Sequence, residues 1–359
     1  MGASGDRPAG PELRVLIFAI GSLGEMVDEI AVLHDIRSAF PQAVVDWAVE
    51  PAMATLLKRV DGSGDILECP LSAWRLWGAS RAKRDMKAFV ARMQKRRYDA
   101  VIDLYGDVRS AWFASKAKGR HFGPVEGPDG TSRPLLARLL ADKTIALGSG
   151  GPAADRPRQL VARALGYEVE GPPRYSLRPR VVPLAKQAVA FVHGAEHEID
   201  LWPETRWVTL GRRLVEQGWD VMLLQMDEAE FVRAERLAAA IDSQITAFRH
   251  EVLKGGPVVQ VWPAMSTGML VDRIAACHAV IGIDSGPSHL AAALDIPHVR
   301  IHNRPVGAAL AASLAQHHAV IGGDSPPSVD AVWACWRQIE RFARARALAA
   351  QAHTRARGA

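Results

Sequence analysis

The stretch AVIGIDSGPSHLAAA, residues 279–293, decides how this chain is interpreted. Its first five residues are apolar and predict a buried strand, and its last four predict a helix. The turn between them therefore presents the free N–H groups of a helix N-terminus, which favour phosphate. Gly286 lets a ligand approach the backbone, and the side chains of Ser285 and His289 supply hydrogen bonds. The alternative is an ordinary strand–helix turn that Ser285 caps.

The same alternation of strand, loop and helix runs along the whole chain, so we expect an α/β fold with parallel, doubly wound sheets. Expected strands cover residues 13–19, 44–49, 65–68, 98–104, 188–192, 220–224, 258–262, 279–283 and 298–302, and expected helices cover 26–40, 203–218, 228–241, 265–277 and 329–350. In such sheets ligands bind beyond the carboxyl ends of the strands, where the 284–289 turn lies.

A length of 359 residues favours two domains, since one domain takes roughly 150 residues. The proline-rich segment 171–185 is expected to be the linker between a first domain, 13–170, and a second, 186–328. Residues 1–12 are polar and rich in Gly and Pro, so we interpret them as a disordered tail and not as a signal peptide. The segment 329–350 is expected to form a terminal helix.

Composition restricts the functional classes. No apolar run approaches the roughly 20 residues that span a bilayer. The three cysteines are far apart and odd in number, which argues against a disulfide framework or a cysteine-based zinc site and favours the cytoplasm.

The net charge is +5, and the segment 75–97 holds nine basic residues and one acid. Such a cationic surface attracts phosphates, anionic lipid headgroups or nucleic acid, although a solvated helix face is an equal alternative. Trp74 and Trp77 lie beside it and are candidates for contact with an interface or a sugar. No nucleic-acid-binding module is recognisable, so no nucleic-acid partner is expected.

A second glycine loop, Gly21-Ser22-Leu23-Gly24-Glu25, follows the first expected strand. It lacks the third glycine of a dinucleotide-binding fingerprint and the Gly-Lys-Ser/Thr of a Walker A loop. Two α/β halves that each carry a ligand-type turn suggest a substrate cleft between them.

Several motifs together resemble the lipopolysaccharide heptosyltransferases of glycosyltransferase family 9. In the first half they are RVLI at residues 14–17, GSLGEM at 21–26, FP at 40–41, DWAVE at 46–50 and YDAVID at 98–103. In the second half they are WPE at 202–204, Trp207 and DSGPSHL at 284–290. The resemblance extends from about residue 13 to about residue 305 in one order.

The resemblance implies a GT-B fold, with two Rossmann-like domains that face a central cleft, and an inverting transfer that needs no metal and no cofactor. The first domain would bind a Kdo-bearing lipid A acceptor, and the second an ADP-heptose donor. The terminal helix would cross back to the first domain. The enzyme would work in the cytoplasm, peripherally on the inner face of the inner membrane.

Site residues follow from the same resemblance. Glu25 matches the family's catalytic aspartate, the base for the acceptor hydroxyl; alternatively it only complements the positive end of the next helix. The matching donor-binding positions are Gly194, Ala195, Asp200, Met265, Asp284, Ser285, Gly286 and His289. The acceptor-binding candidates are Gly21, Ser22, Gly24, Arg75, Arg81, Lys83, Arg84 and Arg109. Met265 would lie along the adenine; alternatively it packs in the core.

Two departures keep other functions open. The family carries a basic residue before its Trp-Pro pair, where this chain has Asp200, and an anion there repels a diphosphate. The donor loop reads His193-Gly194-Ala195, where hydroxyl residues are usual. His193 or His197 are candidates to replace the missing lysine. The alternatives are a relative that transfers a different sugar or uses a protein or small-molecule acceptor, or a weakened, noncatalytic binding protein.

Overall fold

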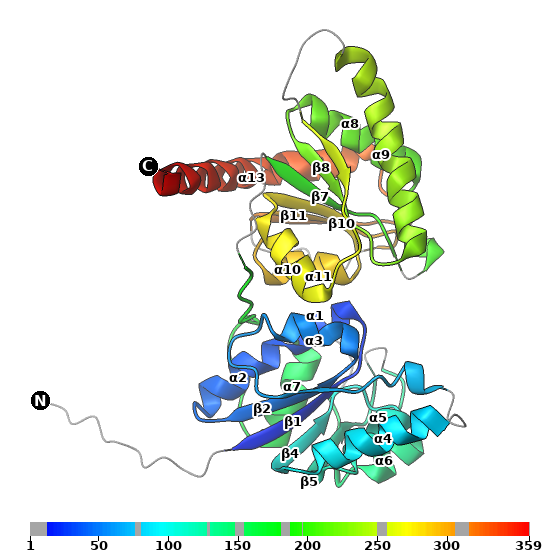
Figure 1. The fold of residues 1–359 in the computed structure, drawn as a ribbon, viewed down its shortest axis with the longest axis vertical. Coiled ribbons are helices and arrows are strands. Elements are labelled where there is room, and N and C mark those ends of the chain that lie inside the picture. Colours follow the sequence, from blue (N-terminus) through cyan, green and yellow to red (C-terminus); the bar gives the residue numbers. More distant parts are fainter. Residues whose placement is uncertain are drawn as a thin grey trace, which may run out of the picture. The chain divides into compact units, whose positions relative to one another are not determined.

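The computed structural model describes residues 13–75, 80–127, 130–147, 154–180, 187–195, 197–249, 257–305 and 316–358. The chain forms two compact units, Met1–Arg178 and Pro179–Ala359 (Figure 1). Their boundary lies inside the segment 171–185, of which residues 181–185 are outside the described part, as is the segment 1–12. The finer domain limits expected from the sequence stay predictions.

The first unit is built on a six-stranded sheet with the order β3-β2-β1-β4-β5-β6, in which the paired strands are parallel. The strands are β1 Arg14–Ala19, β2 Val44–Val49, β3 Ile66–Glu68, β4 Arg97–Asp103, β5 Lys118–Pro124 and β6 Lys143–Ile145. The helices are α1 Leu23–Glu29, α2 Ala31–Ala39, α3 Pro51–Leu57, α4 Ser80–Met93, α5 Val108–Ala114, α6 Leu135–Leu140 and α7 Asp155–Leu165, with a 3₁₀ turn η1 at Ala73–Arg75.

Strand order fixes which helices share a layer. From β3 the chain crosses to β4 and then moves outward to β5 and β6, so right-handed crossovers put α4, α5 and α6 on one face of the sheet. The crossovers from β1 to β2 and β3 run the other way and put α1, α2 and α3 on the opposite face, where α7 packs against α2. Figure 1 shows α4, α5 and α6 together on one side of this unit.

The second unit repeats the plan with the order β12-β11-β10-β7-β8-β9, again with parallel pairs. The strands are β7 Ala188–Val192, β8 Asp220–Leu223, β9 Val259–Val261, β10 Ala279–Ile283, β11 His298–Ile301 and β12 His318–Ile321. The helices are α8 Glu204–Glu216, α9 Glu228–Arg249, α10 Thr267–Ala276, α11 Gly286–Ala293 and α13 Val329–Gly358, with a 3₁₀ turn η2 at Glu198–Asp200. The prediction of an α/β fold with doubly wound parallel sheets is confirmed.

The helix predicted over residues 26–40 is wrong in its extent, because the structure has two helices, α1 and α2, that meet at Ile30. A capping box of Ser22 and Glu25 starts α1 three residues earlier than the apolar spacing suggests. At Ile30 the α-helical hydrogen-bond pattern is interrupted, because the Leu33 N–H donates to the Ile30 carbonyl at 3.2 Å, a bond of 3₁₀ type. The sequence analysis also missed β5, β6 and β12, of which β6 is only three residues long.

The terminal helix α13 begins at Val329, as predicted, and continues eight residues beyond Ala350. It buries Val332, Trp336 and Ile339 in the core of the second unit, where Trp336 packs edge-on against Trp219 with ring centroids 5.3 Å apart. Its predicted return to the first unit stays a prediction. Among the described residues no helix is both long and apolar enough to cross a membrane.

Candidate functional site

The glycine loop of the first unit leaves β1 at the carboxyl edge of its sheet and enters α1. Ser22 caps α1: its Oγ accepts from the Glu25 N–H at 3.4 Å, and the Glu25 carboxylate accepts from the Ser22 N–H at 2.8 Å. A Cβ on Gly21 would lie 2.7 Å from Oε2 of Glu25, so only glycine leaves room for this side chain. The alternative interpretation of Glu25, a residue that stabilises the helix start, is therefore realised in the structure.

Glu25 also lines a cavity of about 170 Å³ within the first unit. Asp28 and Glu29 of α1 lie on its wall, together with Tyr105 from the loop after β4. Arg133 and Arg156 supply positive charge, and the Arg133 guanidinium stacks on the Tyr105 ring, 5.8 Å from its centroid. Glu126 adds a fourth carboxylate near the arginines, so the cavity combines three carboxylates of α1 and one from the loop after β5 with two guanidinium groups.

The charges of this cavity interact. Glu29 is buried, and burial, then the neighbouring carboxylates of Glu25 and Asp28, raise its pKa well above the ordinary value. At the end of β4 the buried Asp103 accepts hydrogen bonds from the N–H groups of Tyr105 and Gly106, at 3.0 and 3.1 Å, and so fixes the loop that carries Tyr105. Burial raises the pKa of Asp103, and these bonds oppose that effect.

The predicted acceptor-binding cations are distributed over two elements. Arg81, Lys83 and Arg84 are exposed on the first turns of α4. Arg109 lies on α5, where its guanidinium is 3.6 Å from the carboxylate of Asp107. The side chain of Arg75, like Trp77, lies outside the described residues.

The expectation that Trp74 touches an interface or a sugar is wrong. Its side chain is buried in the core of the first unit, where its ring packs against Phe89 and Phe113 at 5.8 and 5.1 Å. Burial of three aromatic rings between α4, α5 and the sheet explains the position of Trp74.

The sequence analysis did not select Arg133 and Arg156. Arg156 is held by the backbone, since its guanidinium donates to the carbonyls of Glu126 and Gly127, at 3.2 and 2.8 Å. Both arginines come from segments after β5 and β6, the strands that the sequence analysis missed, so their place at the carboxyl edge was not visible in the sequence.

The 284–289 turn of the second unit leaves β10 at the carboxyl edge and begins α11. Ser285 stands at the N-cap position, but its side chain makes no capping hydrogen bond, and in the described part of the chain its Oγ has no partner. The alternative of an ordinary turn capped by the Ser285 side chain is therefore not supported. Ser288 shapes the turn instead, because its Oγ donates to the Ile283 carbonyl at 2.6 Å.

Asp284 lies at the centre of a charged cluster. His289 Nε2, Arg300 and His302 Nδ1 approach its carboxylate to 3.5, 3.5 and 3.4 Å. Burial by itself raises the pKa of Asp284, but the hydrogen bond from His289 and the charge of Arg300 outweigh burial and hold the pKa well below the ordinary range. The cluster gives the turn a fixed, ionised anchor and directs His289 along the start of α11.

The loop after β7 is also packed tightly. His193 is fully buried, and burial, with a contribution from the charge of Arg233, lowers its pKa to about 4, so its ring is neutral at neutral pH. A Cβ on Gly194 would lie 1.8 Å from the Glu230 carboxylate, so this position requires glycine. Ala195 is half-buried beside it, and Met265 is half-buried in the loop that follows β9.

Asp200, the residue that replaces the family's cation, has a positive neighbour. The Arg304 guanidinium lies 3.5 Å from its carboxylate. Asn303 holds the two loops together, since its amide donates to the carbonyls of Ile199 and Leu201 at 3.3 and 2.8 Å. His197, the proposed substitute, is exposed. Arg304 lies three residues beyond the end of β11, and its position after an expected strand was the signal that could have revealed it.

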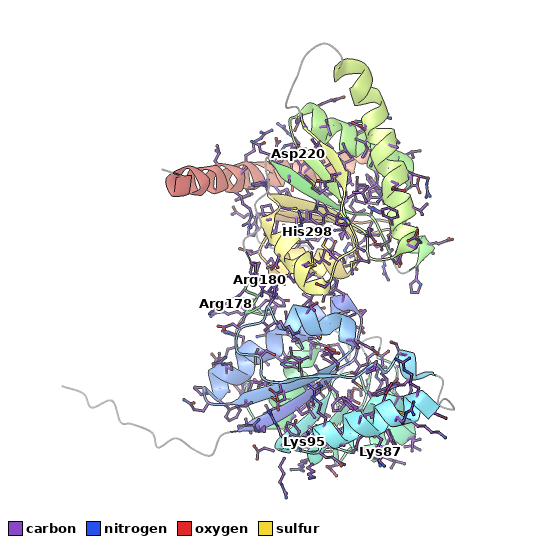
Figure 2. The ribbon with its side chains drawn as sticks, in the orientation of Figure 1. Lys87, Lys95, Arg178, Arg180, Asp220 and His298 are labelled. Atoms are coloured by element: carbon purple, nitrogen blue, oxygen red, sulfur yellow. The ribbon has the colours of Figure 1, made fainter. Side chains whose placement is uncertain are left out.

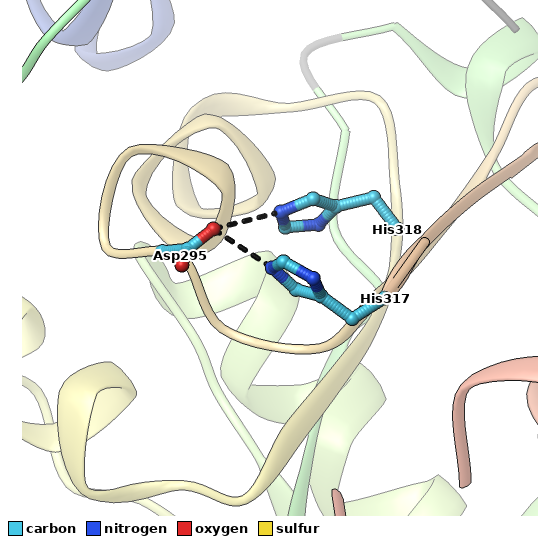
Figure 3. A group of neighbouring side chains, drawn as sticks. All are labelled: Asp295, His317 and His318. Atoms are coloured by element: carbon cyan, nitrogen blue, oxygen red, sulfur yellow. Dashed lines mark hydrogen bonds and ion pairs between the residues drawn. The ribbon is translucent and has the colours of Figure 1, made fainter. Parts of the chain in front are cut away.

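One group among the described residues resembles a metal site, Asp295, His317 and His318 (Figure 3). It lies at the amino ends of β11 and β12, at the opposite edge of the sheet from the 284–289 turn. His317 Nε2 is 2.7 Å from Asp295 Oδ1, an ordinary hydrogen bond. Two ligands of a tetrahedral zinc ion, each at about 2.0–2.1 Å, are about 3.3 Å apart, so the group fits a carboxylate–histidine pair better than a metal centre.

Comparison with known proteins identifies the family of this chain. A model of glycosyltransferase family 9 (heptosyltransferase) matches residues 86–304. Lipopolysaccharide heptosyltransferase 1 of Pseudomonas aeruginosa is 30% identical over 323 residues, which cover 88% of this chain and 85% of that protein. The chain belongs to glycosyltransferase family 9.

Solved structures of family members agree with this assignment. The Escherichia coli heptosyltransferase WaaC, solved with ADP-2-deoxy-2-fluoro heptose, superposes with a TM-score of 0.76 at 26% identity, over 91% of this chain and 99% of that one. The Escherichia coli ADP-heptose heptosyltransferase II has a TM-score of 0.71 at 17% identity, which shows the shared fold. This glycosyltransferase therefore has the predicted GT-B fold. It is an enzyme that transfers a sugar from a nucleotide-sugar donor.

Proposed function

We propose that this glycosyltransferase moves a heptose from ADP-heptose to a Kdo-bearing lipid A acceptor, with inversion at the anomeric carbon. The observation that carries the proposal is the 284–289 turn: a hydroxyl without a partner at Ser285, a histidine held by Asp284, and the N-terminus of an eight-residue helix. Helix N-termini bind phosphate. The WaaC structures with ADP and with ADP-2-deoxy-2-fluoro heptose support a donor of this class.

The reaction requires a base and a stabilised leaving group. An acceptor hydroxyl attacks the anomeric carbon of heptose, the bond from that carbon to the diphosphate oxygen breaks, and ADP leaves. Glu25 is the proposed base that takes the hydroxyl proton. Its carboxylate is exposed and already oriented by the Ser22 N–H, so capping and proton transfer use the same fixed side chain.

The departing diphosphate gains negative charge, which the second unit is suited to receive. The amide groups at the start of α11, the Ser285 hydroxyl and the His289 ring supply donors. Asp200 stands where the family has a basic residue, and Arg304 is proposed to supply the missing cation, because its exposed guanidinium lies beside the Asp200 carboxylate. Gly194, Ala195 and Met265 are proposed to contact the remainder of the donor.

The acceptor is proposed to use the cavity of the first unit and the cations of α4. Arg133 and Arg156 face the cavity, where a sugar carboxylate of the acceptor pairs with guanidinium groups. Arg81, Lys83 and Arg84, exposed on α4, are positioned for lipid phosphates. An anionic glycolipid acceptor places the enzyme at the cytoplasmic face of the inner membrane.

The proposal is tested by ADP release. Purified enzyme is incubated with ADP-heptose and a Kdo-lipid A analogue, and Glu25→Gln is compared with the unaltered chain. A glutamine carbonyl still accepts from the Ser22 N–H, so the cap and the melting temperature stay close to normal. Loss of the base lowers kcat by about a hundredfold or more and leaves the donor KM unchanged.

Glu25→Ala is the matched control for this variant, because it removes the base and the capping hydrogen bond together. It should lose the same activity and also be less stable, by about 1 kcal/mol. Full turnover by Glu25→Gln would contradict the assignment of the base.

A second candidate is a relative that uses a different sugar or a different acceptor. The loop His193-Gly194-Ala195 favours it, because its buried imidazole and lack of hydroxyl groups depart from the family pattern. Competition of a panel of nucleotide diphosphate sugars against ADP-heptose separates the two candidates. Preference for another sugar, with turnover, supports the second; donor binding without turnover indicates a weakened site.

A further inference from the structure

Helix α6 exposes an unusual group of leucines. Leu135, Leu136 and Leu139 are 68%, 56% and 72% exposed, and they are the large apolar side chains that the described part of the first unit leaves open to solvent. Leu139 is four residues from Leu135 and three from Leu136, the spacings at which helix side chains are neighbours, so the three form one patch around Leu139. The opposite side of α6 is buried at Ala137. We refer to Leu135, Leu136 and Leu139 as the leucine patch.

The leucine patch shares its layer with the cationic helix α4. Helices α4, α5 and α6 cover the same face of the sheet: Phe89 of α4 packs on Phe113 of α5 at 5.7 Å, and α5 contacts α6. Helix α4 buries Met86 and Phe89 against the sheet, so its opposite side, like that of α6, points away from the sheet.

That outer side of α4 is positively charged. Arg81, Lys83, Arg84 and Lys87 are exposed on it, and its acidic residue Asp85 lies 4.0 Å from the Arg81 guanidinium. Figure 2 shows Lys87 and Lys95 on the outside of the first unit. Helix α5 lies between α4 and α6, so the cations and the leucines occupy two ends of one helix layer. A face that combines apolar side chains with cations is typical of a surface that binds an anionic membrane.

We propose that the face formed by α4, α5 and α6 docks on a bilayer that contains anionic lipid, with the leucine patch inserted among the headgroups and the α4 cations on the lipid phosphates. Charge complementarity favours a bilayer over another protein. Three side chains are also few for a protein interface, which usually takes roughly 20 to 30 residues on each partner. Shallow insertion needs no more than a few apolar groups.

Under the proposed function this face also explains how a lipid-linked acceptor reaches the cavity. Arg133, which lines the cavity, precedes Leu135 by two residues. The carbohydrate part of a glycolipid therefore enters beside the leucine patch while its acyl chains stay in the bilayer. This step rests on the proposed function, whereas membrane docking itself does not.

The experiment measures binding of the full chain to vesicles by co-sedimentation, with phosphatidylcholine alone and with phosphatidylcholine mixed with phosphatidylglycerol. The triple variant Leu135→Gln, Leu136→Gln, Leu139→Gln is compared with the control Val232→Gln, Leu348→Gln, whose side chains are 43% and 63% exposed in the second unit. Glutamine keeps helix propensity close to that of leucine, and melting temperatures of all variants are recorded.

The unaltered chain and the control should bind mixed vesicles, and the triple variant should bind about tenfold less tightly or worse. Binding should weaken in about 1 M salt, where the screening length falls to about 3 Å. Equal binding by the triple variant, or equal binding to vesicles without phosphatidylglycerol, would overturn the proposal. The proposal would also be overturned if the unaltered chain self-associates and the triple variant is monomeric, because a second copy of the chain then covers the leucine patch.

Activity separates this proposal from the proposed function. The triple variant should turn over a deacylated, water-soluble acceptor normally and a vesicle-embedded acceptor about tenfold more slowly. If vesicle binding depends on the leucine patch but the chain transfers heptose to neither acceptor, the docking proposal stands and the proposed function is refuted.

Discussion

At the scale of single residues, Glu25 combines an observed role in capping α1 with the proposed role of a base. Its carboxylate completes the capping box of α1, which explains why Gly21 precedes it without a side chain. The same bond fixes the carboxylate at the wall of the cavity. The carboxylate of this longer side chain therefore has a structural partner, the Ser22 N–H, that sets its position.

Arg304 and Asp200 form the second pair of interest at this scale. If Arg304 meets the donor diphosphate, Arg304→Ala raises the donor KM about tenfold or more, because a charge-assisted hydrogen bond is lost. Asp200→Asn, which releases the guanidinium from its carboxylate, should not raise the donor KM. Steady-state kinetics at varied donor concentration checks both.

Arg213→Ala serves as the control for Arg304→Ala, since Arg213 also pairs with a carboxylate of this unit, Asp330 at 2.7 Å. An unchanged donor KM in Arg304→Ala would remove this residue from the donor site.

The buried histidines make stability depend on pH. His193 has a pKa lowered by burial to about 4, against an ordinary value of 6.5, and His318 is lowered in the same way to about 4. Between about pH 6.5 and pH 4 these two histidines therefore bind protons more readily in the unfolded chain than in the folded chain. Stability is full above about pH 6.5 and falls as the pH drops towards 4, by roughly 2 to 3 kcal/mol for a fully buried histidine.

Calorimetry across this pH range should show a shallower decline for His193→Gln than for the unaltered chain. The low pKa of Asp284 acts at more acidic pH, because its ion pairs are lost only when that carboxylate is protonated. Parallel declines in the two proteins would show that His193 does not titrate on unfolding.

At the scale of elements, the turn from β10 into α11 depends on close packing. A Cβ on Gly282 would lie 2.5 Å from Ser288 Oγ and 2.5 Å from Val192 Cβ. Ser288 in turn holds the Ile283 carbonyl, so the strand and the helix start are locked together. With Ser288 in this role, the Ser285 hydroxyl takes no part in holding the turn.

Gly282→Ala should therefore destabilise the chain by about 1–3 kcal/mol, the usual cost of an overpacked core. Gly323→Ala is the control, because its nearest neighbour would be 3.7 Å away. Urea denaturation of both variants measures the difference. If Gly282→Ala leaves the free energy of unfolding unchanged, β10 and α11 can move apart without loss of stability.

The elements were largely predictable where apolar runs are continuous. The strands β7 and β10 agree residue for residue with the expected ranges 188–192 and 279–283. The division of 26–40 into α1 and α2 was not predictable from apolar spacing, because the spacing continues across Ile30 while the hydrogen-bond ladder changes. Trp74 was misjudged because a run of cations follows it in sequence, whereas in space it packs against aromatic rings.

At the scale of the molecule, each unit has its own sheet and core, and α13 belongs to the core of the second. Trp336 of α13 is fully buried against Trp219. The last helix is thus a structural part of the second unit, and its loss affects the sheet that carries the 284–289 turn.

Trp336→Ala should lower the free energy of unfolding by about 3–5 kcal/mol, as other large-to-small changes in cores do. Trp333→Ala, at a half-buried position where Arg213 stacks 5.8 Å from the ring, should cost about 1 kcal/mol. Thermal unfolding followed by tryptophan fluorescence compares them. Equal losses would show that α13 does not contribute to the core through Trp336.

The α/β class, the family and the position of the two loops that follow β1 and β10 could be inferred from sequence, because apolar periodicity and short motifs are local properties of the chain. Three arrangements became visible only in the fold: Arg304 beside Asp200, Arg133 and Arg156 around the cavity, and the leucine patch in the same helix layer as the α4 cations. These groups are far apart in sequence or lie on short elements without a periodic signal. Strand order and helix packing bring them together, and charge neutralisation acts through space rather than along the chain.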